Sequence, residues 1–283
     1  EPGVSLLDGA VLHPVSYGQN FDPVSVSIAT ENMKHAMTLG LPELEISTVR
    51  PGRAIIVGSG PSVREHLPEI IRLAHDPQNI VFAINDANDL LMANGIIPHG
   101  FVAVDPLPGL AEYVRAAHPA TLFYISALCA SEVFEALVDF NVEIWFPNGQ
   151  EVDWPIGAWL VPGGTTALTR CPGLAKMLGW RDVTIFGGDS SFAADRRYAY
   201  GDGKYAEDSR SKVVRVMLDN GEGPFYSEEA LLKQACQFGV LAQTPAIKLS
   251  FRCGGLLDAF LKAPTMERDL HEEFNEYNRT HAA

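Results

Sequence analysis

Two glycine-rich turns have the residue types and the spacing to hold an anion. The first turn is GSGPS, made by Gly58, Ser59, Gly60, Pro61 and Ser62. The second turn follows Pro162 and is made by Gly163, Gly164, Thr165 and Thr166. Each turn precedes a predicted helix, whose N–H groups and dipole favour negative charge, and glycine lets the backbone approach a ligand closely. The sequence therefore predicts a phosphate-type site at the first turn and a site for a second anion or a sugar hydroxyl at the second.

Both turns also have a purely structural interpretation. Ser62 and Thr165 are suitable N-cap residues, so each turn can simply start a helix. The first turn lacks the Lys-Ser/Thr ending of a P-loop and the third glycine of the dinucleotide fingerprint. Neither of those motifs therefore assigns its ligand.

Polar residues follow several of the predicted strands. Asn85 and Asp86 follow one strand, Asp105 follows the next, and Gly188 and Asp189 follow a later one. In an open parallel sheet, ligands bind beyond the carboxyl ends of the strands, near the point where the strand order reverses. We expect a composite site there, in which Asp105 and Asp189 bind Mg²⁺ or act as a general base, because hard cations prefer carboxylate oxygens. Capping of the next turn is the structural alternative for each residue.

The elements that must position these residues alternate along the chain. Short apolar runs are typical of buried parallel strands, and each precedes a helical stretch. The predicted strands are 53–57, 80–84, 100–104, 122–125, 142–146 and 183–186, and the predicted helices are 62–74, 86–94, 131–140 and 165–178. A strand at 213–218, a helix at 227–241, a strand at 247–252 and a helix at 255–262 complete the predicted core. This alternation predicts an α/β fold with a doubly wound, mostly parallel sheet and helices on both faces.

The remaining segments flank this core. Residues 1–50 are predicted to be an N-terminal arm packed on the core, with one helix at 28–39, and residues 51–262 to form the nucleotide-binding catalytic domain. The acidic tail, 263–283, is predicted to be an exposed helix or an element of a homodimer.

Composition narrows the class of protein. The chain has 283 residues and a formal net charge of −14, which disfavours an extended nucleic-acid interface because such contacts need clustered Lys and Arg. No apolar run reaches the roughly 18–20 residues of a membrane span. The four cysteines form no CxxC pair, so we expect reduced and mostly buried thiols in a cytoplasmic protein.

A basic segment contrasts with the acidic chain. It contains Arg196, Arg197, Lys204, Arg210, Lys212 and Arg215. The segment is either a local anion-binding patch or a solvated loop and strand edge. The sequence has no GxSxG elbow, and His99 and His118 are interpreted as surface or packing residues. Trp154 and Trp159, before the second glycine turn, can touch a base or an acceptor, although core packing is the commoner role of tryptophan.

The order of the motifs resembles a known family. GSGPS, AIND, FVAVDP, GGTTAL and LGWRDVTIFGGDSSF follow one another as in flagellin motility accessory factors and archaeal 6-hydroxymethylpterin diphosphokinases, over residues 50–260. The same stretch is more distantly similar to bacterial sialyltransferases that use a CMP-activated sugar. The resemblance implies a modified Rossmann fold. It also implies that a nucleotide contacts Gly58, Gly60, Ser62 and Asn85, in a cleft also lined by Gly164, Thr165 and Asp189.

One departure from the sialyltransferases concerns the catalytic base. Those enzymes rely on a histidine after the GxD strand, whereas only His271 and His281 follow Asp189 here. Arg197 can instead supply a cation to the leaving phosphate, with Asp189 or a tyrosine as the base.

Three functions remain open from the sequence. The first is a nucleotide-dependent glycosyltransferase that moves a sugar from a CMP-type donor to a small-molecule or glycan acceptor, with Mg²⁺ as a candidate cofactor. The second is diphosphate transfer from ATP to a pterin alcohol. The third is a non-catalytic, nucleotide-binding accessory protein.

Overall fold

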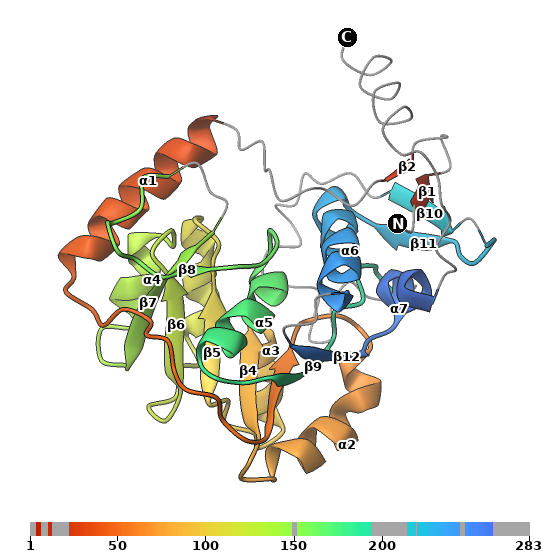
Figure 1. Cartoon of the computed structure of the whole chain (residues 1–283), viewed down its shortest axis with the longest axis horizontal. Coiled ribbons are helices and arrows are strands. Elements are labelled where there is room, and N and C mark those ends of the chain that lie inside the picture. Colours follow the sequence, from red (N-terminus) through yellow and green to blue (C-terminus); the bar gives the residue numbers. More distant parts are fainter. Residues whose placement is uncertain are drawn as a thin grey trace.

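The structure, a computed structural model, is built on one large parallel sheet (Figure 1). It describes residues 4–6, 11–12, 23–148, 152–193, 214–218, 220–243 and 247–262. Eight strands lie in the order β12-β9-β3-β4-β5-β6-β7-β8, and every neighbouring pair is parallel. They are β3 (Arg53–Val57), β4 (Ile80–Ile84), β5 (Gly100–Ala103), β6 (Leu122–Ser126), β7 (Val142–Pro147), β8 (Leu160–Val161), β9 (Asp182–Phe186) and β12 (Lys248–Arg252). The predicted α/β class is confirmed.

Helices cover both faces of this sheet. One layer contains α1 (Pro23–Thr38), α2 (Val63–Ala74), α3 (Ala87–Ala93), the 3₁₀ helix η1 (Pro108–Val114) and α4 (Ser131–Ala136). The other contains α5 (Ala167–Met177), α6 (Glu229–Ala242) and α7 (Gly255–Lys262). None of the described helices combines the length and the apolarity needed to cross a membrane.

Burial on two faces explains why the strands are continuously apolar. In β3, Ile55 and Val57 pack in the layer of α1 to α4, whereas Ala54 and Ile56 pack in the layer of α5 to α7. All four side chains are fully buried. A strand covered on both sides needs an apolar residue at every position. Three of the four cysteines, Cys129, Cys171 and Cys236, are likewise buried free thiols.

The strand order reverses between β3 and β9. From β3 the chain adds strands one after another as far as β8, and α5 then returns it to place β9 on the other side of β3. The residues that follow β3 and β9 therefore emerge side by side at the carboxyl edge. This is the position at which open α/β sheets bind ligands.

A second, smaller sheet is antiparallel. Its order is β11-β10-β1-β2, formed by β1 (Val4–Leu6), β2 (Val11–Leu12), β10 (Val214–Leu218) and β11 (Phe225–Ser227). The strand predicted at 213–218 exists, but its placement in the main core was wrong. A short apolar run does not specify which sheet a strand joins, because the pairing partners are distant in the sequence. The small sheet is joined to the loop after β9, since Phe192 N donates to Tyr226 O at 2.7 Å and Ser227 Oγ donates to Ser190 O at 2.8 Å.

An ion-pair network links three strands at the amino edge of the main sheet. Asp182, the first residue of β9, accepts hydrogen bonds from Arg53 Nε at 3.0 Å and from Lys248 Nζ at 2.9 Å. Arg53 and Lys248 begin β3 and β12, which are the two neighbours of β9. Partial burial acts to raise the pKa of Asp182, but the hydrogen bonds and charges of Lys248 and Arg53 outweigh burial and lower that pKa.

We expect Asp182→Asn to lower the free energy of unfolding by about 1 kcal/mol at neutral pH, because it removes a partly exposed ion-pair network. The lowered pKa means that the stabilisation is complete above the unfolded pKa near 4 and is lost as the pH falls through the folded pKa. Urea unfolding of both proteins at pH 7 and at successively lower pH measures this difference. If the difference in free energy of unfolding between the two proteins stayed constant down to about pH 2, the ion-pair network would not be the source of the stabilisation.

Candidate functional site

The first glycine turn, residues 58–62, contacts the loop after β9, residues 187–191, which we call the acidic loop. Gly60 N donates to Gly187 O at 2.9 Å, and Gly58 N donates to Phe186 O at 2.8 Å. A Cβ atom at position 60 would lie 2.6 Å from Gly187 O and 2.8 Å from Asp189 Cγ. The close contact between two loops therefore requires glycine at position 60, whatever ligand the turn holds.

Asp189 joins three loops through one buried carboxylate. The residue is 3% exposed, and its Oδ2 accepts from Ser62 N at 2.7 Å. Its Oδ1 accepts from Ser62 Oγ at 2.5 Å and from Gly254 N, between β12 and α7, at 2.8 Å. Charge-assisted hydrogen bonds of this kind are stronger than neutral ones. In this arrangement both oxygens are engaged in holding the fold, and a role of Asp189 as base or Mg²⁺ ligand stays a prediction.

The backbone of the acidic loop is itself fixed from the side of α7. Leu257 N donates to Asp189 O at 2.9 Å, and Leu256 N donates to Ser191 Oγ at 2.9 Å. Gly188 N donates to Cys253 Sγ at 3.2 Å. Ser190 has φ +55° and donates from Oγ to Gly188 O at 3.1 Å. The carboxylate of Asp189 is thus presented by a loop with little freedom to move.

The first glycine turn keeps fewer free donors than its sequence suggests. The N–H groups of Gly58, Gly60 and Ser62 are used within the fold, and Pro61 has none. Ser59 Oγ donates to Asp86 Oδ1, so the turn also contacts the residues that follow β4. No described residue accepts a hydrogen bond from Ser59 N. The predicted anion cradle therefore offers the N–H of Ser59 rather than a ring of amides.

Asn85, directly after β4, is the most unusual residue at this edge. Its φ is +52°, a left-handed conformation that asparagine tolerates better than most residues. Its side-chain oxygen is shielded from solvent and has no hydrogen-bond partner among the described residues. Buried polar groups nearly always have partners, so each exception needs an explanation. A ligand that binds here and donates a hydrogen bond to Asn85 would provide one.

The second glycine turn is closed by a side chain from α6. Gln237 Oε1 accepts from Thr165 N at 2.9 Å and from Thr165 Oγ1 at 3.2 Å. These two donors are therefore not open to the second anion predicted from the sequence. The N-cap of α5 is Thr166, whose Oγ1 accepts from Thr169 N at 3.2 Å, so the alternative that Thr165 caps this helix was wrong by one residue.

Asp105 lies apart from Asp189. Two strands, β3 and β4, separate β5 from β9, which at about 4.8 Å per strand puts the ends of β5 and β9 roughly 14 Å apart. Mg²⁺–oxygen distances are about 2.1 Å, so this separation disfavours one ion shared by both residues. No group of three or more His, Cys, Asp or Glu side chains suited to a metal occurs within the part of the chain that the structure describes. A metal at either carboxylate stays a prediction.

The surroundings of Asp105 suit a proton acceptor better than a fold-holding residue. The residue is exposed, and its Oδ1 accepts one local hydrogen bond, from Leu107 N at 2.9 Å. Although the residue reaches solvent, protein atoms packed around its carboxyl group desolvate that group and raise its pKa, and the bond from Leu107 offsets part of this effect. The two aspartates predicted as equivalent therefore differ in burial and in bonding.

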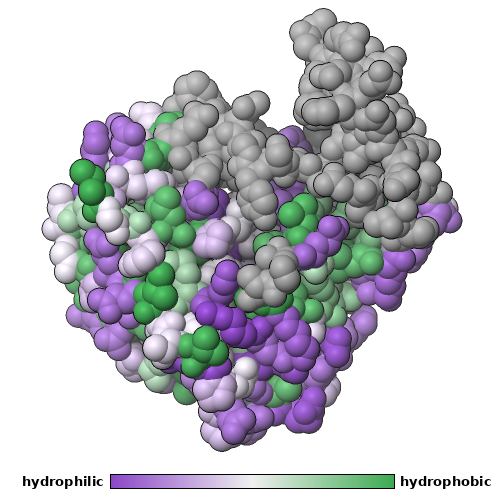
Figure 2. Space-filling view, in the orientation of Figure 1, coloured by the Kyte–Doolittle hydropathy of each residue, from purple (hydrophilic) through white to green (hydrophobic). Residues whose placement is uncertain are grey.

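The remaining residues predicted to contact a ligand are Trp154, Trp159 and Arg197, and they lie in different parts of the protein. Trp154 packs on Phe146, with ring centroids 5.6 Å apart, whereas Trp159 is 56% exposed. Figure 2 shows apolar residues scattered among polar ones over much of the view, with more of them gathered where α6 and α7 lie in Figure 1. Arg197 and the basic segment from 196 to 212 lie outside the described residues, so the role of Arg197 stays a prediction.

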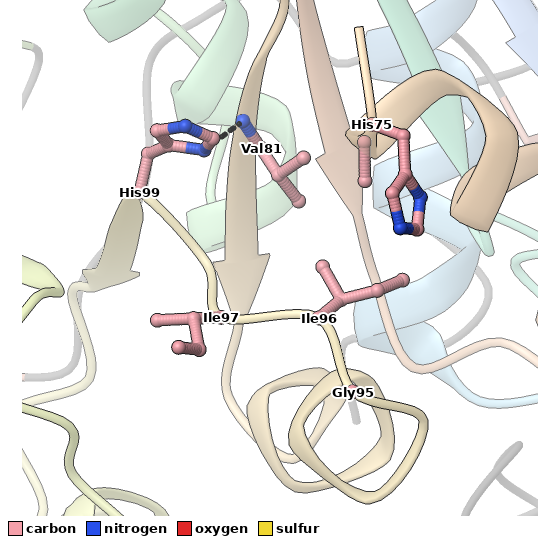
Figure 3. Close-up of a pocket in the computed structure, with 7 residues that line it drawn as sticks. His75, Val81, Gly95, Ile96, Ile97 and His99 are labelled. Carbon is pink, nitrogen blue, oxygen red and sulfur yellow. Dashed lines mark hydrogen bonds between the residues drawn. The ribbon is translucent and has the colours of Figure 1, made fainter. Parts of the chain in front are cut away.

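A cavity of about 210 Å³ lies at the opposite, amino edge of the sheet (Figure 3). It is lined by Ala74, His75, Val81, Gly95, Ile96, Ile97 and His99. His99 Nδ1 accepts from Val81 N at 3.1 Å, and burial lowers the pKa of His99, so its ring is a neutral packing group. This hollow is separate from the residues gathered at the carboxyl edge.

A parallel sheet with a glycine turn at its reversal point defines a Rossmann-like protein. Within that class, the chain belongs to the MptE-like family, described as 6-hydroxymethylpterin diphosphokinase MptE-like, whose model matches residues 28–195. The family expected from the order of the motifs is thereby confirmed.

The fold is also found in a solved enzyme structure. MAf glycosyltransferase from Magnetospirillum magneticum AMB-1 is 17% identical, with a TM-score of 0.59 over 94% of this chain and 43% of that chain. The chain thus spans less than half the length of that enzyme. No curated protein matches the sequence. The description of the family names a group-transfer enzyme, which supports a transferase-type function.

Sequence reasoning missed Gly254, Gln234 and Gln237 as parts of the site. Gly254 lies in a short connection whose only signal is a Gly-Gly pair. The two glutamines stand three residues apart in the stretch ALLKQACQFGVLA of α6, whose only other polar residue is Lys233. That spacing was a usable signal, because residues so spaced lie on one face of a helix.

We expect Asp189→Asn to lower the free energy of unfolding by about 2–4 kcal/mol, since an amide nitrogen would oppose buried N–H donors that each cost about 1–3 kcal/mol when unsatisfied. Asp105→Asn is the matched control and should change stability by less than about 1 kcal/mol, because its side chain is exposed. Urea unfolding of the two variants measures this. Wild-type stability in Asp189→Asn, together with lost nucleotide binding, would instead mean that Asp189 meets the ligand directly.

Proposed function

We propose that the chain is a nucleotide-dependent transferase whose nucleotide lies over the first glycine turn, where the strand order reverses. The observation that carries this proposal is the carboxamide of Asn85, whose buried oxygen lacks a partner among the described residues. Ser59, which contacts the next residue, Asp86, supplies in the same small region an N–H that no described residue accepts. A nucleotide has both the phosphate oxygens that accept from Ser59 and the hydroxyl or amino groups that donate to Asn85.

The proposed reaction is transfer of a sugar from a CMP-type nucleotide sugar. The bond between the anomeric carbon and the phosphate oxygen breaks, a bond to the acceptor hydroxyl oxygen forms, and the acceptor proton passes to a base. The leaving CMP gains negative charge on its phosphate, which the N–H of Ser59 and the N-terminus of α2 would stabilise. Arg197, predicted from the sequence, would add a positive charge to the same group.

Asp105 is the proposed base. It follows β5, whose end lies two strand spacings, or about 10 Å, from the end of β3, where the first glycine turn begins. If the phosphate lies on that turn, Asp105 is placed nearer to the sugar that the nucleotide carries than to the phosphate. A raised pKa improves a carboxylate as a proton acceptor. Asp189 is less suited to this step, because its oxygens already accept from Ser62 and Gly254.

Diphosphate transfer is the second candidate, and the description of the family favours it. In that reaction a pterin hydroxyl oxygen attacks the β-phosphorus of ATP, and AMP leaves. The N–H of Ser59 would then contact the α-phosphate, which remains on the AMP that leaves. Nucleotide binding without turnover would leave the third function, an accessory protein.

We expect thermal unfolding to separate these candidates, because a ligand that binds only the native state raises its Tm. CMP, CDP, UDP, GDP, ATP and CMP-sialic acid are compared, each with and without Mg²⁺. The largest rise with cytidine nucleotides would support glycosyl transfer, and the largest rise with ATP and Mg²⁺ would support diphosphate transfer. No rise with any nucleotide would contradict the proposed function.

We expect Asn85→Gly to weaken nucleotide binding by at least 10-fold, with little change in the Tm of the free protein. Glycine keeps the left-handed backbone, and the lost carboxamide bonds to no described residue. Calorimetric titration with the best nucleotide of the comparison measures the affinity. The control is Asn94→Ala at the other end of α3, where Asn94 Nδ2 donates to Leu90 O at 2.8 Å, and it should bind as the wild type does. Equal affinities in both variants would remove Asn85 from the site.

A further inference from the structure

Two glutamines of α6 lie against the loops of the candidate site. Gln234 and Gln237, which we call the glutamine pair, are 6% and 5% exposed. In Figure 1, α6 stands between α5 and α7, in the layer that covers β9 and β12. Residues three apart share one face of a helix, so both side chains reach the same side of α6.

Gln237 fixes the second glycine turn. Its Oε1 accepts two hydrogen bonds from Thr165, a residue 72 positions earlier in the chain. A Cβ atom at Gly164 would lie 2.0 Å from that oxygen, so the turn packs directly on the carboxamide. Its Nε2 donates to no described residue. One side chain therefore sets the position of the turn that begins α5.

Gln234 links the same turn to the acidic loop. Thr166 Oγ1 donates to Gln234 Oε1 at 2.9 Å, and Gln234 Nε2 donates to Ser190 Oγ at 3.1 Å. Ser190 Oγ donates in turn to Gly188 O at 3.1 Å. Thr169 Oγ1 donates its hydrogen bond to Thr166 O at 3.0 Å. The hydroxyl of Thr166 is therefore left to donate to Gln234. The chain of donors thus has one direction from the cap of α5 to the backbone beside Asp189.

Among the described residues, the hydrogen-bond partners of the glutamine pair lie in these two loops. Neither carboxamide bonds to a described residue of the core, although both side chains are buried. An apolar residue would fill such positions without desolvating an amide. The hydrogen bonds to the two loops, rather than packing, therefore explain why these two buried positions are glutamines.

We propose that Gln234 and Gln237 are positioning residues of the nucleotide site, which set the separation between the second glycine turn and the acidic loop. This inference rests on the proposed function. Asp189 in the acidic loop holds Ser62, so the pair also governs where the second glycine turn stands relative to the first. Neither glutamine is required to touch the nucleotide for this role.

Amide hydrogen exchange followed by NMR tests the loop contacts without any ligand. Methionine keeps the length and the helix preference of glutamine but not its hydrogen bonds. In Gln237→Met the N–H of Thr165 should exchange at least 10-fold faster, and in Gln234→Met the amides of the acidic loop should do so. Gln237→Glu retains an acceptor for Thr165 and should restore slow exchange there. Gln243→Met, at the exposed end of α6, should change neither loop, and unchanged exchange in both buried variants would overturn the inference.

Calorimetric titration with CMP, and with ATP and Mg²⁺, separates positioning from a merely structural role. Gln234→Met and Gln237→Met should bind the nucleotide that the wild type prefers at least 10-fold more weakly, while Gln243→Met keeps wild-type affinity. Faster loop exchange with unchanged affinity would overturn the positioning role. A wild-type protein that binds no nucleotide of the thermal comparison would overturn the proposed function itself, and the exchange rates would then decide alone whether the pair fixes the loops.

Discussion

The carboxylate of Asp189 is the interaction on which the carboxyl edge of the sheet depends. It accepts from two groups of Ser62 and from the backbone of Gly254, so three loops that follow three different strands meet at one buried charge. A buried carboxylate is tolerated only when hydrogen bonds compensate for its lost hydration. The shape of the first glycine turn, the course of the acidic loop and the start of α7 are therefore set together, and displacement of one disturbs the other two.

The sequence predicted those features whose cause is local. Strands such as β3 and β4 are short apolar runs between glycine or polar residues because helices cover both of their faces, and this pattern gave their bounds correctly. The same reasoning placed the first glycine turn, Asn85 and the acidic loop at one edge, and hydrogen bonds between Ser59 and Asp86 and between Ser62 and Asp189 confirm that they meet.

The features that escaped prediction depend on partners distant in the chain. Ser62 and Asp189 are 127 residues apart, and Thr165 and Gln237 are 72 apart, so no local pattern reveals that their donors are used within the protein. The sheet joined by β10 depends on its pairing with β1, near the start of the chain. Burial also separates Asp189 from Asp105, although both follow a parallel strand and look alike in the sequence.

The position of β12 has a consequence for where this protein can be divided. The family model ends at residue 195, yet β12, at residues 248–252, is the outer neighbour of β9 and supplies Lys248 to Asp182. A chain cut at that limit would expose the backbone edge of β9, an apolar strand open to pairing with other molecules. It would also remove Gly254 from Asp189 and the glutamine pair from the second glycine turn. The cooperative unit of folding is therefore larger than the segment by which the family is recognised.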